Sequence, residues 1–188
     1  MTKELDGQTI AFLVANEGVE QVELTDPWKK VVDEGGTPHL IAPQSGKVQA
    51  FDHLTSADEF DVDVVVSDAD AADYDAVVLP GGVANPDQLR LDADAVSFLK
   101  GFVETGKPIA AICHAPWTLV EAGVVDGRTL TSWPSLRTDI ENAGGTWVDR
   151  EVVVCDCRPS LLVTSRNPDD LPAFNAQLVE TFAKANAG

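Results

Sequence analysis

The chain has 188 residues, of which 44% are hydrophobic, and its 31 acidic against 13 basic side chains give a formal charge of −18. This length and composition predict one globular domain over residues 1–188 and exclude a small disulfide-held protein or a disordered tail. No apolar run reaches the roughly 18 residues of a membrane-spanning helix. The negative charge opposes binding to nucleic acid or to an anionic membrane surface.

The cysteines and the first residues of the chain indicate a compartment. Three cysteines are too few for the disulfide framework of a secreted protein, and no apolar segment of a secretory signal follows Met1. We therefore expect a cytoplasmic protein with reduced thiols. The acidic composition is typical of a salt-rich cytoplasm, where screening relieves self-repulsion, so we expect a halophilic source; an ordinary acidic enzyme is the alternative.

The first part of the chain predicts a strand, a helix and a second strand. Thr9–Val14 is an apolar run typical of a strand, and apolar residues at helical spacing predict a helix from about Glu20 to Glu34. A second strand is expected at Pro38–Ala42. Between residues 43 and 73 the chain is polar and only Val62–Val66 is strongly β-like. We expect short strands or an excursion from the sheet there.

The rest of the chain alternates strands with helices. The expected strands are Asp75–Leu79, Pro108–Ile112, Glu151–Val154 and Leu161–Thr164. The expected helices are Asp92–Thr105, Pro116–Ala122, Pro134–Ala143 and Leu171–Ala185. This alternation predicts an α/β fold with a mostly parallel sheet and helices on both faces. Ligands of such sheets bind at the carboxyl ends of the strands.

One cysteine stands where chemistry is expected. Cys113 lies between a predicted buried strand and a helix, and a thiol on such a sharp, exposed turn can reach a substrate. The alternative is a buried cysteine that acts as a small apolar side chain. His114 follows it directly and is a candidate base, although adjacent side chains in a sharp turn can diverge.

Two further loops are predicted at the same edge of the sheet. The first carries Glu17, Glu20 and Glu23, one of which could point inward and move protons. The second contains Gly81 and Gly82, whose backbone N–H groups could form an oxyanion hole. Neither loop has a phosphate-binding glycine pattern, so no nucleotide cofactor is expected.

These segments together resemble the ThiJ/PfpI family, and the resemblance extends from about Ile10 to Phe182. The motifs that carry it are Ala15–Leu24, Asp75–Gly82 and Ala111–Pro116, supported by Thr131–Pro134, Asn142–Gly145, Val163–Arg166 and Asp169–Pro172. The resemblance is greatest to the intracellular peptidase branch of that family. It implies a flavodoxin-like three-layer sandwich that self-associates, as a dimer or a ring built from dimers, and that needs no cofactor or metal.

The resemblance also assigns roles to the residues at the expected site. Cys113 would be the nucleophile, His114 the acid/base and Glu20 the glutamate that contacts the thiol. The backbone of Gly81 and Gly82 would form part of the oxyanion hole.

In the peptidase branch an acid after the glycine pair reaches the histidine of a neighbouring subunit, and Asp87 is the matching residue. Asp87 is one methylene shorter than glutamate, and its loop carries an extra residue. Trp117 and Trp133 either line the pocket or belong to the core. Cys155 and Cys157 depart from the family pattern, and we interpret their loop as inert. His39 and His53 are interpreted as structural.

Three functions are compatible with these residues. The first is chemistry on reactive dicarbonyls, as a glyoxalase that converts methylglyoxal to lactate or as a deglycase of early glycation adducts. The second is peptide hydrolysis by an acyl-enzyme mechanism. The third is a redox-sensing stress protein or chaperone whose Cys113 oxidises to a sulfinate. The expected partners are accordingly a small aldehyde or a peptide.

Overall fold

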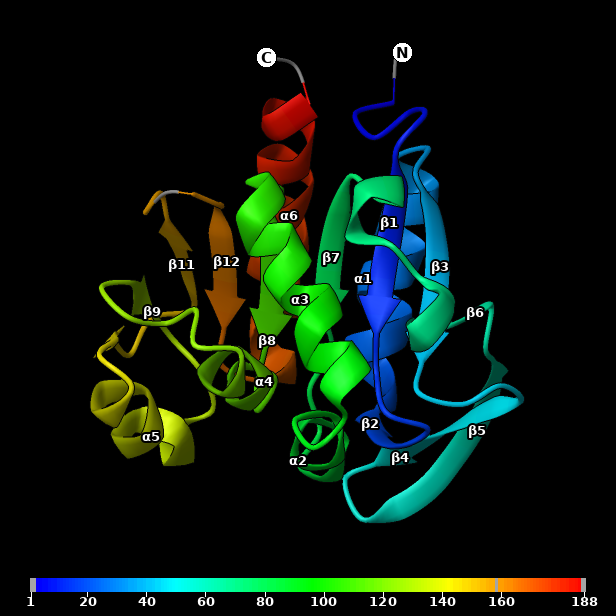
Figure 1. The fold of residues 1–188 in the computed structure, drawn as a ribbon, viewed down its shortest axis with the longest axis horizontal. Helices are drawn as coiled ribbons and strands as arrows, with labels where there is room; N and C mark the ends of the chain where they lie inside the picture. The colour runs from blue at the N-terminus through cyan, green and yellow to red at the C-terminus, as the bar shows by residue number, and fades with distance from the viewer. Residues whose placement is uncertain (1–2, 158, 187–188) are drawn as a thin grey trace.

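A seven-stranded sheet forms the centre of the computed structural model, which describes residues 3–157 and 159–186 (Figure 1). Its strands are β1 (Thr9–Leu13), β3 (Thr37–Ala42), β6 (Val64–Val65), β7 (Ala76–Leu79), β8 (Ile109–Ile112), β11 (Val152–Cys155) and β12 (Leu162–Ser165). Their order in the sheet is β11-β12-β8-β7-β1-β3-β6. All neighbours run parallel except β11, which pairs with β12 in antiparallel register.

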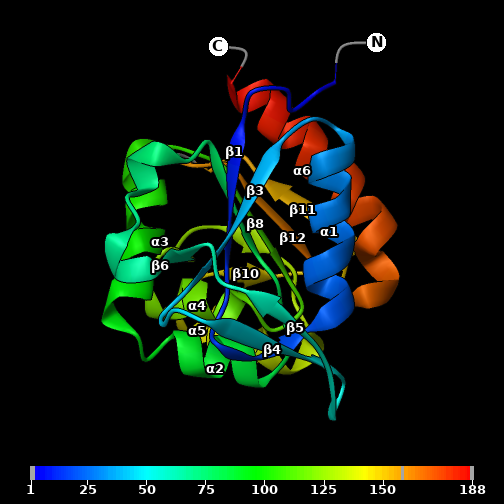
Figure 2. The ribbon, with the colours of Figure 1, turned by 90° about the vertical axis from the view of Figure 1, so that its right-hand side faces the viewer.

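Helices cover both faces of this sheet (Figure 2). Helices α1 (Gln21–Asp33) and α6 (Leu171–Asn186) lie on one face, and α3 (Ala93–Thr105) lies on the other. Three short helices follow strands or turns near the carboxyl edge: α2 (Ala84–Leu89), α4 (Pro116–Glu121) and α5 (Arg137–Asn142). The 3-10 turns are η1 (Val66–Asp68), η2 (Ala71–Asp73), η3 (Pro134–Leu136) and η4 (Pro168–Asp170).

The alternation of side chains along each strand divides the interior into two cores. In β1, Phe12 packs into the core under α1 and α6, while Leu13 packs into the core under α3. Both residues are fully buried. Because successive strand residues point to opposite faces, a sheet that is covered twice needs continuous apolar strands. This explains why the strands of the sequence are unbroken apolar runs.

A smaller sheet stands beside the carboxyl edge of the main one. It contains β2 (Glu17–Glu20), β4 (Lys47–Asp52) and β5 (Thr55–Asp61) in the order β2-β4-β5. Strands β4 and β5 form a hairpin, and Leu54 in its turn is 97% exposed. A further pair, β9 (Thr129–Leu130) and β10 (Thr146–Trp147), lies near α5. The predicted excursion between residues 43 and 73 is therefore mainly this hairpin.

The predicted α/β class, flavodoxin-like with a mostly parallel sheet, is confirmed. The expected helix from Glu20 begins one residue later, because Glu20 is the last residue of β2. Sequence reasoning missed β2 and α2, which are too short to show a periodic pattern of apolar residues. Within the described residues, no helix is both long and apolar enough to span a bilayer.

Candidate active site

A pocket of about 820 Å³ opens at the carboxyl edge of the main sheet, between that edge and the small sheet. The loops after β1, β7 and β8 all contribute to it, as the topology of an open parallel sheet predicts. The lining residues are Glu17, Gly18, Glu20, Glu23, Phe51, His53, Leu54, Gly82, Val83, Ala84, Asp87, Cys113, His114, Trp117, Trp133 and Pro168.

Cys113 occupies the sharp turn that the sequence predicted between β8 and α4. Its φ angle is +63°, a left-handed conformation that few side chains adopt. Its N–H donates to the carbonyl of Ser165 (3.1 Å), and its own carbonyl accepts the N–H of Trp133 (2.9 Å). These bonds hold the strained turn from two sides, and they aim the sulfur into the pocket.

Glu23 is the glutamate that contacts the thiol. It lies on the buried face of α1 with Leu24, Pro27 and Val31, and its side chain is fully buried. Its carboxyl group interacts with the Cys113 thiol, and its Oε2 accepts the N–H of Gly81 at 2.9 Å. A carboxyl group in this position can exchange a proton with the sulfur or with a bound substrate.

The assignment of this contact to Glu20 was therefore wrong. Glu20 ends β2 rather than beginning a helix, so its side chain does not follow the inward face of α1. Its Oε2 instead accepts the backbone N–H of His53 at 3.1 Å. Residues three apart are neighbours on a helix surface, so only the true start of α1 distinguishes Glu20 from Glu23.

Burial governs the protonation of the thiol and its acid. Desolvation raises the pKa of Glu23 to about 8, and the nearby charge of Glu20 adds to this rise. Burial and the carboxylate of Glu23 also raise the pKa of the Cys113 thiol. At neutral pH Glu23 is therefore protonated, which removes its charge from beside the sulfur. Its O–H can then donate to a thiolate, and α4, with six residues, adds little dipole of its own.

His114 lies beside the sulfur in an aromatic environment. Its Nδ1 is 3.1 Å from the Sγ of Cys113, and its ring stacks on Trp133 (centroids 5.4 Å apart) and tilts against Trp117 (5.3 Å). Burial lowers the pKa of His114 to about 4. The imidazole is consequently neutral at pH 7, and it can accept a proton from the thiol or from a substrate hydroxyl.

The glycine loop after β7 brings backbone N–H groups to the sulfur, although not in the predicted way. The Gly81 N–H is already donated to Glu23, so this part of the oxyanion-hole prediction is not supported by the structure. The N–H groups of Gly82 and His114 approach the sulfur instead. Gly82 has φ +82°, and a Cβ there would stand 2.3 Å from the carbonyl of Gly18, so only glycine fits.

Asn85 fixes this loop to the loop after β1. Its buried side chain accepts the N–H of Ala15 (2.6 Å) and donates to the carbonyls of Pro80 and Gly81 (2.9 Å each). Sequence reasoning passed over Asn85 because an asparagine after a glycine pair is common in ordinary turns. Its buried position and three bonds show that it holds the two loops in place.

Asp87 lies on α2 and lines the pocket, but its side chain is exposed. In the described part of the chain, no carboxylate is hydrogen-bonded to the ring of His114. Within one chain the predicted contact between Asp87 and His114 is therefore absent. That Asp87 reaches the histidine of a neighbouring subunit stays a prediction.

The small sheet supplies the opposite wall of the pocket. His53, interpreted from the sequence as structural, lines the pocket and has φ +53°. Glu20, Asp52 and His53 place one ligand-type atom each within 4.8 Å of one another, and this is the one group among residues 3–157 and 159–186 with the make-up of a metal site. Phe51 adds an aromatic side chain to this wall.

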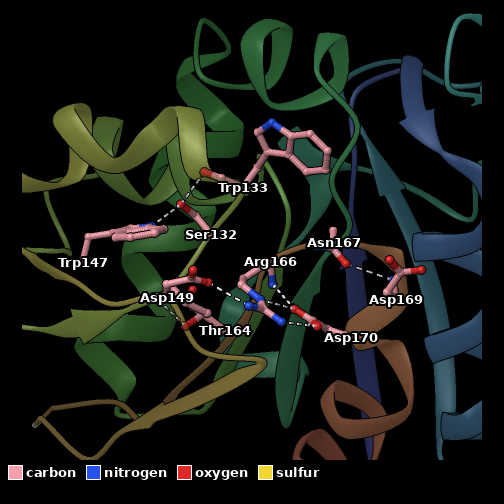
Figure 3. A network of polar contacts seen from close by, with 10 residues as sticks. Ser132, Trp133, Trp147, Asp149, Thr164, Arg166, Asn167, Asp169 and Asp170 are labelled. Carbon is pink, nitrogen blue, oxygen red and sulfur yellow. Dashed lines mark hydrogen bonds and ion pairs between the residues drawn. The ribbon is translucent and has the colours of Figure 1, made fainter.

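A polar network supports the loops that carry Trp133 and Pro168 (Figure 3). Arg166 donates to both carboxylate oxygens of buried Asp170 (2.9 Å each) and to Asp149 (2.7 Å). Above it, the indole N–H of Trp147 donates to Ser132 Oγ (3.0 Å), which donates to the carbonyl of Trp133. Trp117 and Trp133 both line the pocket, which confirms the first of the two expectations for them, pocket wall rather than core.

Cys155 and Cys157 lie at the end of β11. Strand β11 runs antiparallel to β12, so its end lies at the amino edge of the parallel strands, away from Cys113. Cys155 is buried and Cys157 is exposed, and both are free thiols. Neither lines the pocket.

Comparisons with known proteins agree with this arrangement. The DJ-1/PfpI family profile matches residues 8–181. General stress protein 18 of Bacillus subtilis is 42% identical over 165 residues, which cover 88% of this chain and 92% of that protein. Protein/nucleic acid deglycase 2 of Escherichia coli is 40% identical over 168 residues, covering 89% and 94%. The structure of Drosophila melanogaster DJ-1beta matches with a TM-score of 0.80 at 27% identity, over 94% of this chain and 90% of that one.

Proposed function

Because the chain belongs to the DJ-1/PfpI family, we propose that it is a cysteine-dependent enzyme that acts on reactive dicarbonyls. The reaction is the conversion of methylglyoxal to lactate, the removal of early dicarbonyl adducts from amino groups or thiols, or both. Several relatives at 38–40% identity are named deglycases. The observation that carries the proposal is the contact between the Cys113 sulfur and the buried carboxyl group of Glu23.

The reaction begins when the thiol adds to the aldehyde carbon. The sulfur forms a bond to that carbon as the C=O π bond opens, and the thiol proton passes through His114 to the aldehyde oxygen, which gives a hemithioacetal. His114 is suited to the first transfer because its neutral Nδ1 is 3.1 Å from the sulfur. The N–H groups of Gly82 and His114, which approach the sulfur, stabilise the oxygen as charge develops on it.

The second stage moves a proton between the two carbons of the dicarbonyl. A base removes the proton from the carbon that carries sulfur, and the resulting enediol is protonated at the neighbouring carbon, which gives a thioester. Glu23 and His114 are the groups within reach of the sulfur, and a carboxyl group with a pKa near 8 can both give and take a proton at neutral pH. Hydrolysis of the thioester releases lactate and restores the thiol.

Peptide hydrolysis is the second candidate, and the short distance between His114 and the sulfur favours it. Amide cleavage makes a stricter demand, because the histidine must hold the thiol proton as a charged imidazolium until it protonates the leaving amine, whereas hemithioacetal formation passes that proton on to the aldehyde oxygen at once. Burial opposes that charge, and no carboxylate of the described chain compensates it. A carboxylate from a second subunit would be needed, as the expected homo-oligomer would provide.

The deciding experiment measures methylglyoxal consumption and lactate formation beside cleavage of a fluorogenic peptide, for the natural chain and for Cys113→Ser. Cys155→Ser is the matched control because that thiol lies outside the pocket. Lactate formation that is lost only in Cys113→Ser supports the proposal. Cys113-dependent peptide cleavage without any dicarbonyl turnover would replace it with the peptidase.

A further inference from the structure

The wall opposite the thiol carries a polar cluster that the proposed reaction does not use. Glu20, Asp52 and His53 lie at the junction of β2 with the β4–β5 hairpin, and their side-chain oxygen and nitrogen atoms lie within 4.8 Å of one another. Glu20 and His53 also line the pocket. Three acceptor atoms at this spacing match the three N–H groups of an ammonium ion, or the donor edge of a guanidinium.

The charges around the pocket favour the same ligands. Its lining includes the carboxylates of Glu17, Glu20 and Asp87, in addition to the protonated Glu23, and it contains no lysine or arginine. Arg90 contacts the pocket residue Trp117, with its guanidinium carbon 5.9 Å from the ring centroid, and it is paired with Glu121 at 3.4 Å. The pocket thus has a negative electrostatic potential, which stabilises a bound cation and destabilises a bound anion.

Aromatic side chains complete the site. Phe51, Trp117 and Trp133 line the pocket together with the carboxylates. Aromatic faces attract cations through their quadrupole, and this attraction is strongest where water is partly excluded. Carboxylates and aromatic rings around one cavity are the surroundings that proteins use for ammonium and guanidinium groups.

We propose that Glu20, Asp52 and His53 form a subsite for the positively charged part of the substrate, so that the enzyme prefers dicarbonyl adducts next to an ammonium or guanidinium group. The reactive carbon then lies at Cys113 while the charge lies against the small sheet. This inference rests on the proposed function and narrows its substrate class. It also implies discrimination against phosphate-bearing adducts, although one relative is named a protein/nucleic acid deglycase.

The test uses three phenylglyoxals with different para substituents: a trimethylammonium group, hydrogen and a sulfonate. Each places its charge away from the reacting carbonyls. We expect kcat/KM to fall from the cationic to the neutral to the anionic substrate. In Glu20→Gln and in Asp52→Asn the ratio of cationic to anionic kcat/KM should fall by about threefold to tenfold, the effect of one charge a few ångströms away in a partly hydrated site.

Glu104→Gln is the matched control, because it removes one negative charge from the exposed surface of α3, outside the pocket. Its charge ratio should equal that of the natural chain. Each variant is compared with the natural chain on the same substrate, so the electronic effects of the substituents cancel. A charge ratio that Glu20→Gln and Asp52→Asn leave unchanged would overturn the proposal.

A binding measurement separates this inference from the proposed function. Phenyltrimethylammonium and benzenesulfonate are titrated against Cys113→Ser with EDTA present, and quenching of tryptophan fluorescence reports occupancy of the pocket. Tighter binding of the cation, weakened in Asp52→Asn, supports the subsite even if no phenylglyoxal is turned over. Equal binding of the two ions refutes it even if the enzyme proves to be a glyoxalase.

Discussion

The two walls of the pocket are built in opposite ways. The wall that carries Cys113 belongs to the main sheet, where strand β8 is fully buried and the strained turn after it is held by backbone bonds. The wall that carries Glu20, Asp52 and His53 belongs to the small sheet, whose strand β5 is mostly exposed. The first wall can keep a reactive geometry because the main sheet is packed on both faces, which fixes the positions of its loops. The second can change its charges at little cost to folding.

The comparison teaches where reaction and selectivity are encoded. A buried carboxyl group such as Glu23 acquires its unusual pKa from the core around it. The exposed cluster acts through the field in the pocket, which depends on the number and sign of charges. We therefore expect substitutions in the first wall to abolish turnover, and substitutions in the second to change the choice of substrate.

The largest expected effect tests the first wall directly. Cys113→Ser should lower kcat/KM for methylglyoxal by more than about 1,000-fold, since a serine hydroxyl is a far weaker acid and a far weaker nucleophile than a thiol. Lactate formation measures it, and Cys157→Ser serves as a control because that exposed thiol lies outside the pocket. Residual Cys113→Ser activity within tenfold of the natural chain would refute the site.

The next effect concerns the support of the loops rather than the reaction. Arg166→Met leaves the buried carboxylate of Asp170 without its two charged bonds, and this should cost about 3 kcal/mol of unfolding free energy. Urea unfolding measures it. Lys47→Met is the control, because its ion pair with Glu59 is largely exposed and lies outside this network, so its loss should lower the unfolding free energy far less.

A comparison of two glutamates sharpens the contrast between the walls. Glu23→Gln should lower kcat/KM for neutral methylglyoxal by about 100-fold, because the amide cannot transfer the proton. Glu20→Gln should lower it by less than about tenfold, since Glu20 contacts His53 and not the sulfur. Equal losses of kcat/KM in the two variants would show that the reaction and the choice of substrate are not encoded in separate walls.

The smallest expected effect is a pH dependence of stability. The folded-state pKa of Glu23 is about 8, above its unfolded value of 4.5, so the folded chain holds a proton that the unfolded chain releases. The stability from this group is fully present below about pH 4.5 and is lost as pH rises through 8. The slope is about 1.4 kcal/mol per pH unit at most within that window.

Denaturant unfolding at pH 6 and pH 7.5 measures this slope. Glu23→Gln should flatten the profile, whereas Glu180→Gln, an exposed surface change on α6, should leave it as in the natural chain. A natural chain whose stability is constant over this interval would place the pKa of Glu23 near its ordinary value.

The sequence was sufficient to predict the main sheet and the nucleophile. Strands such as β8 are continuous apolar runs because both faces are covered, and the turn after it is marked by Cys113 and Pro116. For the small sheet the sequence predicted only short strands or an excursion over residues 43–73, because its exposed strands are polar. The choice between Glu20 and Glu23 escaped prediction, since it depends on the residue at which α1 begins. The pocket position of His53 depends on a pairing of β2 with β4 that no local pattern reveals.

The contact between Glu23 and Cys113 joins residues that are 90 positions apart in the chain, and the glycine loop that flanks the sulfur comes from a third segment. A newly made or unfolded chain therefore carries an ordinary cysteine with an ordinary carboxylate far away. The special chemistry of the sulfur arises only when α1, β7 and β8 have docked. Its reaction rate with a thiol reagent therefore reports whether these three segments have docked.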